Sequence, residues 1–520
     1  MSELSILESL INGGSDAVLR SYFSQLSEEA LHVESIAYKE RLRCRFVDER
    51  YPNGNGGSDE SLAIAMDSRG FVEVSPGAFH LQDTFSKSGS RKRKRRGLED
   101  DDATTGDSST SVQLEALSKT VLALETRGWP ATFLIVYDEV WDLMAQLTPL
   151  ITAACSVSKC PDRSMVANGD ILCWNVNRGK SGFSPHRDRQ PSDVPASFYN
   201  PTQGLGPRYA SCWVSLNHGA KNNTSCLYMI PRAIDPGYLN GDDADDCDQS
   251  TQSLSTATAT SACYSSLANS PSSSSSTATR MTTKTTAFPE ISTSMSTSLD
   301  PLARALSVDK HNYQYIRGFQ LPRGGAVIFS HRVLHWGSTV DEDDVPFEAL
   351  EKPVKRAKTR ISLSFAVSDP AFEASYIRDE KSIKEDGGSS SVTRKICVYP
   401  ELRLRIALAC GQLICYYQRF DTPLALLEKM YLAFRSQSDK FAQYYVAKVA
   451  AEFAAAVREK VVEDGSGQNK SISGDLSSYE VESDAILESA LEAALDAKMS
   501  GELDGNFSSL ADDFDDGESN

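Results

Sequence analysis

The sequence predicts an α+β protein whose core is a β-sandwich of the jelly-roll type, flanked by helices and followed by an all-α C-terminal region. Three observations carry this prediction. Short segments with the alternation of half-buried strands gather between residues 113 and 380. Helical periodicity dominates the regions before and after that segment. Long polar stretches interrupt the chain and lack the apolar content that a packed core needs, so we expect disordered insertions.

Length and composition limit the classes of protein that fit. The 520 residues exceed what one hydrophobic core usually organises, so we expect several folded units. A mean hydropathy of -0.34 and a net charge of -18 fit a soluble protein and argue against a nucleic-acid footprint over the whole surface. We find no spanning segment and no secretory signal, and the 11 scattered cysteines fit a reducing compartment. We therefore expect no membrane partner and a location in the nucleus or cytoplasm.

Residues 1–83 form the predicted N-terminal helical region, with a short strand region expected over residues 61–83. A disordered basic linker is predicted over residues 84–112. Its run RKRKRR, Arg91 to Arg96, has two interpretations: a signal that binds a nuclear import receptor, or a solvated run of charge that nothing recognises. No aromatic residue is interleaved with this run, which argues against nucleic acid as its partner.

Residues 113–380 form the predicted central domain, with a disordered insertion over residues 241–300 and a smaller charged one over 341–357. We expect, in order, a helix in LEALSKTVLALE, a buried strand in TFLIVY, a helix in DEVWDLMAQLTPLI with Asp138 as its N-cap, and strands in GDILCWNV, YASCWVSLN, SCLYMIP, YIRGFQLPRGGAVIFS and RISLSFAV. Because these strands are short and mostly alternating, they favour a β-sandwich of the jelly-roll type.

Residues 394–462 form the predicted helical C-terminal region, in which apolar residues recur at helical spacing. Its tyrosines are expected in the core or at an interface. Residues 463–520 form a mostly disordered acidic tail, and DAILESALEAALDAKM within it has the pattern of an amphipathic segment that docks on a partner. The sequence does not indicate an oligomeric state.

The tripeptide from His186 to Asp188 is a candidate for metal binding. With 7 histidines and 71 acidic residues in the chain, a His-x-acid match arises roughly once by chance, so the motif alone carries little weight. In an extended strand, however, His186 and Asp188 share one face while Arg187 points the other way. A second histidine would complete a set of two histidines and one carboxylate, which is typical of non-haem Fe(II) oxygenases. His331 and His335, at the end of a late strand, are the candidates.

The segment from about residue 130 to 370 resembles the phytanoyl-CoA dioxygenase family of Fe(II)- and 2-oxoglutarate-dependent oxygenases. The resemblance depends on the order of several features: the His-x-Asp, a strand with Trp213, an Asn-Asn followed by CLYMIP, a turn with glycine before a strand, the late LHWGS, and a strand with a basic residue. It implies that the core is a double-stranded β-helix, or cupin-like jelly roll. It also implies Fe(II), 2-oxoglutarate and O2 as cofactor and cosubstrates.

The family pattern implies that His186, Asp188 and His335 are the iron ligands. LHWGS around His335 matches the family motif, whereas SHRVL around His331 does not. The alternative for His335 is a histidine packed in the core beside Trp336.

The resemblance also implies residues that bind the cosubstrate. A guanidinium holds a carboxylate bidentately, where an ammonium gives only a point charge, so we expect Arg360 to anchor the distal carboxylate of 2-oxoglutarate. Ser362 lies two residues further along the same strand face and could add a hydrogen bond. The stretch from His335 to Arg360 is longer than the family pattern and Lys358 shares the face, so Lys358 stays an alternative anchor.

Trp213 either lines the pocket or is an ordinary core tryptophan, and His218 and Asn223 are more typical of turns than of ligands. The implied activity is hydroxylation of an unidentified small organic substrate, with release of succinate and CO2 and with no catalytic residue beyond the metal ligands. An aspartate at position 188 favours hydroxylation over halogenation. The alternative is a non-catalytic jelly-roll scaffold in the nucleus, which predicts a substituted ligand, whereas the full set is present.

Overall fold

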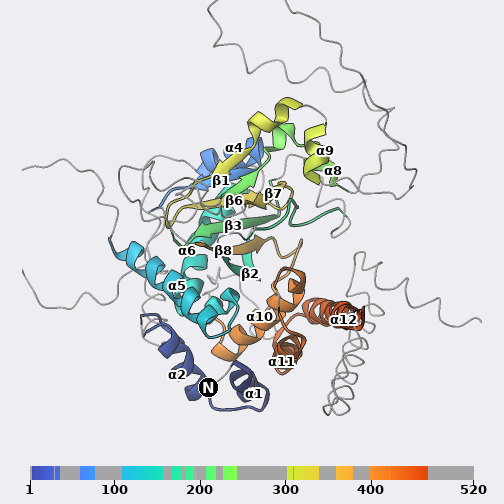
Figure 1. Ribbon diagram of the computed structural model, residues 1–520. Coiled ribbons are helices and arrows are strands. Elements are labelled where there is room, and N and C mark those ends of the chain that lie inside the picture. The colour runs from blue at the N-terminus through green and yellow to red at the C-terminus, as the bar shows by residue number, and fades with distance from the viewer. Residues whose placement is uncertain are drawn as a thin grey trace, which may run out of the picture.

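Figure 1 shows the protein as a computed structural model. The structure describes residues 3–28, 30–34, 59–76, 108–155, 165–177, 180, 182–191, 194, 206–217, 226–242, 301–307, 310–338, 359–378, 399–420 and 422–466. Several predictions lie outside the described residues: the run from Arg91 to Arg96, residues 243–300 and 341–357, the tail beyond residue 466, and the single residues His218, Asn223 and Lys358. In the described part of the chain, none of the helices combines the length and the apolar character needed to cross a membrane.

A five-stranded sheet forms the centre of the fold, and its strand order is β1-β6-β3-β8-β2. The strands are β1 (Phe71–Val74), β2 (Val166–Asn177), β3 (Tyr209–Ser215), β6 (Ala326–Ser330) and β8 (Thr359–Ser368). Every pairing is antiparallel. The predicted strands in GDILCWNV, YASCWVSLN, AVIFS and RISLSFAV are therefore confirmed.

A smaller antiparallel sheet packs against the first one. Its order is β5-β4-β7, and its strands are β4 (Leu227–Met229), β5 (Arg317–Phe319) and β7 (His335–Gly337). The two sheets meet through an apolar cluster that includes Phe71 and Phe329 from the larger sheet and Leu227 and Phe319 from the smaller one. The rings of Phe71 and Phe319 make an edge-on contact at 5.3 Å between their centres.

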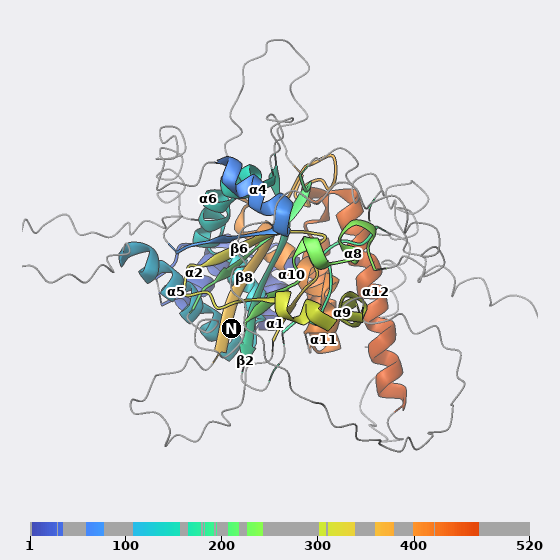
Figure 2. The same ribbon diagram turned by 90° about the horizontal axis from the view of Figure 1, so that it is seen from above.

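Helices cover the other face of the five-stranded sheet. They are α1 (Glu3–Ile11), α2 (Asp16–Leu26), α4 (Asp59–Arg69), α5 (Ser108–Thr126), α6 (Asp138–Cys155), α10 (Leu402–Cys415), α11 (Leu424–Arg435) and α12 (Gln443–Ser466). Three short elements lie elsewhere: α8 (Gly237–Asn240) contributes to the cluster between the sheets, α9 (Pro301–Ser307) packs beside the smaller sheet, and the 3-10 turn η6 (Tyr417–Arg419) follows α10. The main core joins apolar residues of these longer helices to the odd-numbered residues of β8. In the view of Figure 2, α6 and α12 lie on opposite sides of the strands.

The two ends of the described chain pack together. Figure 1 shows α1 and α2 beside α10 and α11. Arg403 donates to Asp16 at 2.5 Å, and Lys429 lies 3.6 Å from Glu8. The C-terminal helices predicted from periodicity are confirmed, and they belong to the same core as the N-terminal helices.

Three local predictions are corrected. TFLIVY, predicted as a strand, forms the 3-10 helix η1 (Ala131–Val136), and all six of its residues are buried. A short apolar run is buried equally well in either conformation, so its pattern could not distinguish them. Residues 61–69 are helical in α4 rather than a strand, and β1 begins only after Gly70, whose φ of 85° ends the helix. Asp138 is the first residue of α6, and its carboxylate pairs with the buried Arg405 at 2.6 Å.

Candidate metal centre

The three predicted metal ligands come from two chain segments that are joined through their backbones. His186 and His335 form an antiparallel bridge in which the amide of each donates to the carbonyl of the other at 3.0 Å. The segment around His186 is not part of a regular strand, and this isolated bridge joins it to β7. Asp188 follows two residues later, and His335 opens β7. This pairing brings the early and late motifs to one place.

The side chains of His186, Asp188 and His335 converge. One ligand atom of each residue lies within 4.8 Å of the ligand atoms of the other two. Oδ1 of Asp188 is 3.5 Å from Nε2 of His335 and 3.9 Å from Nε2 of His186. Ligands at about 2.1 Å from one ion lie about 3 Å apart when they occupy adjacent positions. A small inward movement of the three side chains therefore suffices to close them on a metal.

The backbone fixes the tautomer of both imidazoles. Nδ1 of His186 lies 2.7 Å from the carbonyl of Ser184, and Nδ1 of His335 lies 3.0 Å from the carbonyl of Val333. A carbonyl can only accept, so each Nδ1 carries the proton and each Nε2 keeps its lone pair. Metal-binding histidines in proteins are oriented in this way.

The carboxylate is also prepared for a cation. Oδ2 of Asp188 accepts a short hydrogen bond from the hydroxyl of Ser211. Burial favours the neutral acid, but the neighbouring His335 and His186 and the Ser211 hydroxyl outweigh it and lower the pKa of Asp188. Burial lowers the pKa of His186 to about 3, and His335 adds to that shift. At neutral pH the pair is thus an ionised carboxylate and a neutral imidazole, the forms that bind metals.

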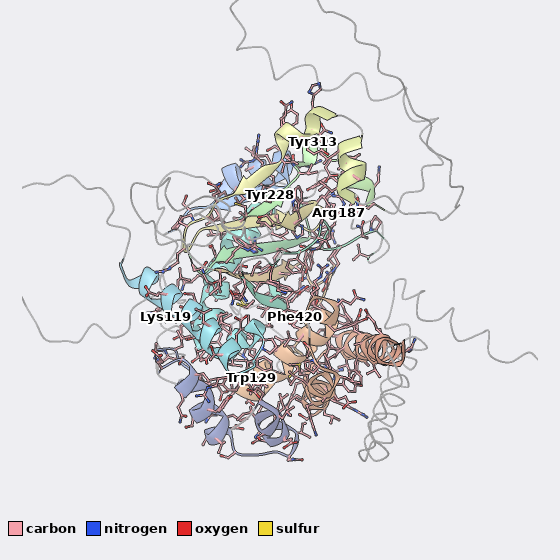
Figure 3. The ribbon with its side chains drawn as sticks, viewed as in Figure 1. Lys119, Trp129, Arg187, Tyr228, Tyr313 and Phe420 are labelled. Atoms are coloured by element: carbon pink, nitrogen blue, oxygen red, sulfur yellow. The ribbon has the colours of Figure 1, made fainter. Side chains whose placement is uncertain are left out.

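Arg187 points away from the ligand set, as the alternation predicted, and anchors the segment. Its guanidinium makes two paired contacts, to Asp235 at 2.7 and 2.8 Å and to Asp242 at 2.9 Å through both Nε and Nη2. Gly237 leaves the space for it, because a Cβ there would lie 2.3 Å from Nη2 of Arg187. Figure 3 labels Arg187 near α8. This anchoring role was missed in the sequence, where nothing links Arg187 to two distant aspartates.

The ligand set opens into a cavity of about 1430 Å³. The cavity lies against the face of the five-stranded sheet that is turned away from the main core. Along β8, Arg360, Ser362 and Ser364 line the cavity, whereas Ile361 and Leu363 lie in the main core. The alternation of the strand therefore delivers polar side chains to the cavity.

Arg360 reaches the cavity beside β7, the strand that begins at His335. Its Nη1 donates to the carbonyl of Cys226 at 3.0 Å, and its guanidinium carbon lies 5.9 Å from the ring centre of Trp213. A Cβ on Gly182 or Gly337 would come within 2.7 or 2.8 Å of its Nη2, so both glycines make room for the guanidinium. Burial lowers the pKa of Arg360 to about 10, and the group stays cationic at neutral pH. Sequence reasoning missed both glycines, although Gly337 stands in LHWGS.

Ser362 and Trp213 also lie where the sequence placed them. The hydroxyl of Ser362 is buried in the cavity wall and has no hydrogen-bond partner among the described residues. Buried hydroxyls are normally satisfied, so an orphaned one in a cavity fits a polar ligand. Trp213 lines the cavity and belongs to the apolar cluster between the sheets, so the pocket and core interpretations both hold.

His331 does not join the ligand set. It is buried, its Nδ1 lies 3.0 Å from the carbonyl of Tyr209, and its ring lies 5.1 Å from that of Phe372. His335 instead packs 4.3 Å from the His186 ring and 4.6 Å from the Phe329 ring. Between the two candidate histidines, the geometry brings His335 to the early motif.

The C-terminal helical region supplies one wall of the cavity, which the sequence did not predict. Arg419, at the end of η6, lies with its guanidinium carbon 4.6 Å from the ring centre of Phe183. The ring of Phe420 stacks on Trp174 at 4.6 Å with 9° between the planes. Figure 3 labels Phe420 near α10. Only contact in the folded chain reveals these residues, because no local pattern distinguishes them from core aromatics.

Comparisons with known proteins find remote structural likenesses only. No model of a known protein family matches the sequence, and no curated protein sequence matches it. AviO1 from Streptomyces viridochromogenes Tue57 is similar at 11% identity over 61% of this chain and 98% of that chain, with a TM-score of 0.29. The epimerase SnoN from nogalamycin biosynthesis, in complex with Fe3+, alpha ketoglutarate and nogalamycin RO, is similar at 12% identity over 60% and 83%, with a TM-score of 0.30.

HygX from Streptomyces hygroscopicus, with nickel and 2-oxoglutarate bound, is similar at 10% identity over 60% of this chain and 87% of that chain, with a TM-score of 0.30. Identities and TM-scores this low do not transfer a function. The chemical assignment therefore rests on the residues of the site.

Proposed function

We propose that the protein is an Fe(II)- and 2-oxoglutarate-dependent dioxygenase that hydroxylates a small organic molecule. The observation that carries this proposal is the convergence of His186, Asp188 and His335, with both Nδ1 protons held by backbone carbonyls. Two imidazoles and one carboxylate on one side of an ion leave its other positions for a cosubstrate and O2. Fe(II) bound there supplies oxygen activation, coupled to the conversion of 2-oxoglutarate to succinate and CO2.

The chain's own residues bind and orient the cosubstrate in this proposal. Arg360 holds the distal carboxylate bidentately, and the unpartnered hydroxyl of Ser362 adds a hydrogen bond. Trp213 flanks the guanidinium, with 5.9 Å between the guanidinium carbon and the centre of the ring. Gly182 and Gly337 admit the guanidinium to the cavity, so a larger side chain at either position would displace it.

We further propose that the two sheets form a double-stranded β-helix and that the chain is a member of the phytanoyl-CoA dioxygenase family. The order of the sequence motifs and the position of the ligand set beside β7 support this finer assignment. The aspartate ligand supports hydroxylation rather than halogenation. A location in the nucleus or cytoplasm belongs to the same proposal and rests on the sequence alone.

The test is an anaerobic titration of the protein with Fe(II) and 2-oxoglutarate, followed by visible absorption. We expect a metal-to-ligand charge-transfer band in the wild type. His186→Ala should abolish the band, because one of the three ligands is lost. His311→Ala is the matched control, since this histidine is exposed and outside the cavity lining, and it should keep the band. A wild-type protein that shows no band at full metal loading would contradict the proposal and favour the non-catalytic scaffold.

A further inference from the structure

The cavity lining holds a further guanidinium, that of Arg419, far along the chain from Arg360; Arg187 and Arg189, which also line the cavity, are paired with carboxylates. Arg419 lines the cavity, keeps part of its surface exposed and packs over the ring of Phe183. Burial lowers its pKa, and no carboxylate contributes to that shift. No described carboxylate forms an ion pair with Arg419, in contrast to Arg187, which is held by two aspartates.

An aromatic wall connects Arg419 to the metal ligands. Trp174 makes an edge-on contact with Phe183 at 4.1 Å and a stacked contact with Phe420 at 4.6 Å. The ring of Phe183 lies 5.3 Å from that of His186. The guanidinium carbon of Arg419 lies 4.6 Å from the centre of the Phe183 ring, so its distance to the centre of the His186 ring cannot exceed the sum of 4.6 and 5.3 Å. A molecule of modest length spans from the cation to the ligand set.

The wall also carries an unused hydrogen-bond donor. The indole N–H of Trp174 is buried and has no partner among the described residues. An orphaned donor in a cavity wall indicates a polar ligand atom nearby. The wall therefore combines an apolar surface, one donor and one cation at its outer end.

We propose that this wall is the substrate subsite and that the substrate is an organic acid with an apolar body. Its carboxylate is bound by Arg419, and its body lies on Trp174, Phe183 and Phe420. One guanidinium balances the single charge of a carboxylate and matches its planar geometry. The inference rests on the proposed function, because the subsite places the body of the acid beside the metal ligands. Arg360 and Arg419 then divide two carboxylates between them, one of the cosubstrate and one of the substrate.

The test uses phenylalkanoic acids of increasing length, from phenylacetate to 6-phenylhexanoate, and the corresponding amides. Calorimetry measures their binding to anaerobic protein saturated with Fe(II) and 2-oxoglutarate, and to the metal-free protein. We expect at least one acid to bind and its amide to bind about 10- to 100-fold more weakly, because a charge-assisted pair is lost. Arg419→Gln should weaken the acid by the same factor and leave the amide nearly unchanged.

Two further variants keep the interpretation specific. Arg435→Gln, at an exposed arginine of α11 outside the cavity lining, should bind the acid like the wild type. Phe420→Ala should weaken acid and amide equally, because it removes apolar surface and no charge. The inference is overturned if no acid binds, if acid and amide bind alike, or if Arg419→Gln binds the acid like the wild type.

Failure of the subsite and failure of the oxygenase remain distinguishable. If the charge-transfer band appears but acid binding does not depend on Arg419, the proposed subsite is wrong and the proposed oxygenase function stands. Acid binding that depends on Arg419 without any band removes the oxygenase, and with it the role of the acid as substrate.

Discussion

The two faces of the five-stranded sheet are built from alternate residues of the same strands, yet their chemistry differs. In β8, Ile361 and Leu363 pack into the main core under the helices. Their neighbours Arg360, Ser362 and Ser364 line the cavity. Because side chains alternate along a strand, the same strand serves the core with one set of residues and the cavity with the other.

The difference teaches that the cavity face carries polar groups which lower the stability of the sheet, as the proposed binding site requires. Arg360 is 3% exposed, and the Ser362 hydroxyl has no partner among the described residues. A buried polar group without a hydrogen bond costs about 1–3 kcal/mol in protein mutational data. Apolar residues at these positions would give a more stable sheet, so their polarity indicates a ligand. Substitutions on the two faces should therefore have opposite consequences.

The largest effect is expected at the proposed metal ligands. Asp188→Asn keeps the shape and the acceptor for Ser211 but removes the charge, so affinity for a divalent ion should fall by more than the ~100-fold that loss of a supporting residue costs. Titration with Co(II), followed by absorption, measures this loss. The midpoint of urea unfolding of the metal-free protein should not fall. Unchanged Co(II) affinity in Asp188→Asn would show that the three side chains are not a metal site.

The second effect belongs to the core face. Leu363→Ala should lower the free energy of unfolding by about 2–5 kcal/mol, because it removes buried methyl groups and leaves a cavity. Its neighbour Ser362→Ala is the matched control on the opposite face and should change the stability by less than about 1 kcal/mol. Urea denaturation compares the two. If Ser362→Ala proves the more destabilising, the division of labour between the faces is wrong.

The third effect is the opposite of the second: binding is lost and stability is kept. Arg360→Met should raise the dissociation constant for 2-oxoglutarate by about 10- to 100-fold, since a bidentate charge pair is lost, while leaving the fold as stable or more so. Arg360→Lys should keep part of the affinity, because the charge remains and the fork does not. Titration of 2-oxoglutarate against the charge-transfer band measures both. An Arg360→Met protein with wild-type affinity would assign the cosubstrate to another cation.

The smallest effect separates the packed His331 from the two histidines that we propose as ligands. Burial, with the charge of Arg332, lowers the pKa of His331 to about 3, whereas an unfolded histidine titrates near 6.5. The unfolded chain therefore binds more protons between these values, and the stability due to His331 is complete above about pH 6.5 and is lost as the pH falls toward 3. The loss between pH 6.5 and 5 should be about 2 kcal/mol.

His331→Asn keeps a donor for the carbonyl of Tyr209 and cannot take up the proton. Chemical denaturation at several pH values should show a shallower pH dependence for this variant than for the wild type. Its affinity for Co(II) should stay within about twofold of the wild type, because His331 is outside the ligand set. A large loss of Co(II) affinity in His331→Asn would show that His331, rather than His335, binds the metal.

Local pattern predicted much of the fold. The alternation in RISLSFAV and the helical spacing of the C-terminal segments each depend on neighbours in the chain, and both agree with the structure. TFLIVY failed because burial on all sides leaves no periodicity, and the 3-10 helix that it forms is decided by its surroundings. The His-x-Asp motif was visible in the sequence, but the numbers of histidine and acidic residues in the chain make roughly one such match expected by chance.

The sequence by itself determined which residues can bind a metal and a carboxylate, because that depends on the chemistry of each side chain. Tertiary structure alone decided which of them meet. The backbone bridge selects His335 and leaves His331 in the packing between strands. The fold also carries Arg419 and Phe420 from the C-terminal helices to the cavity wall. Contacts between residues so far apart depend on the packing of whole sheets and helices, and no local spacing encodes them.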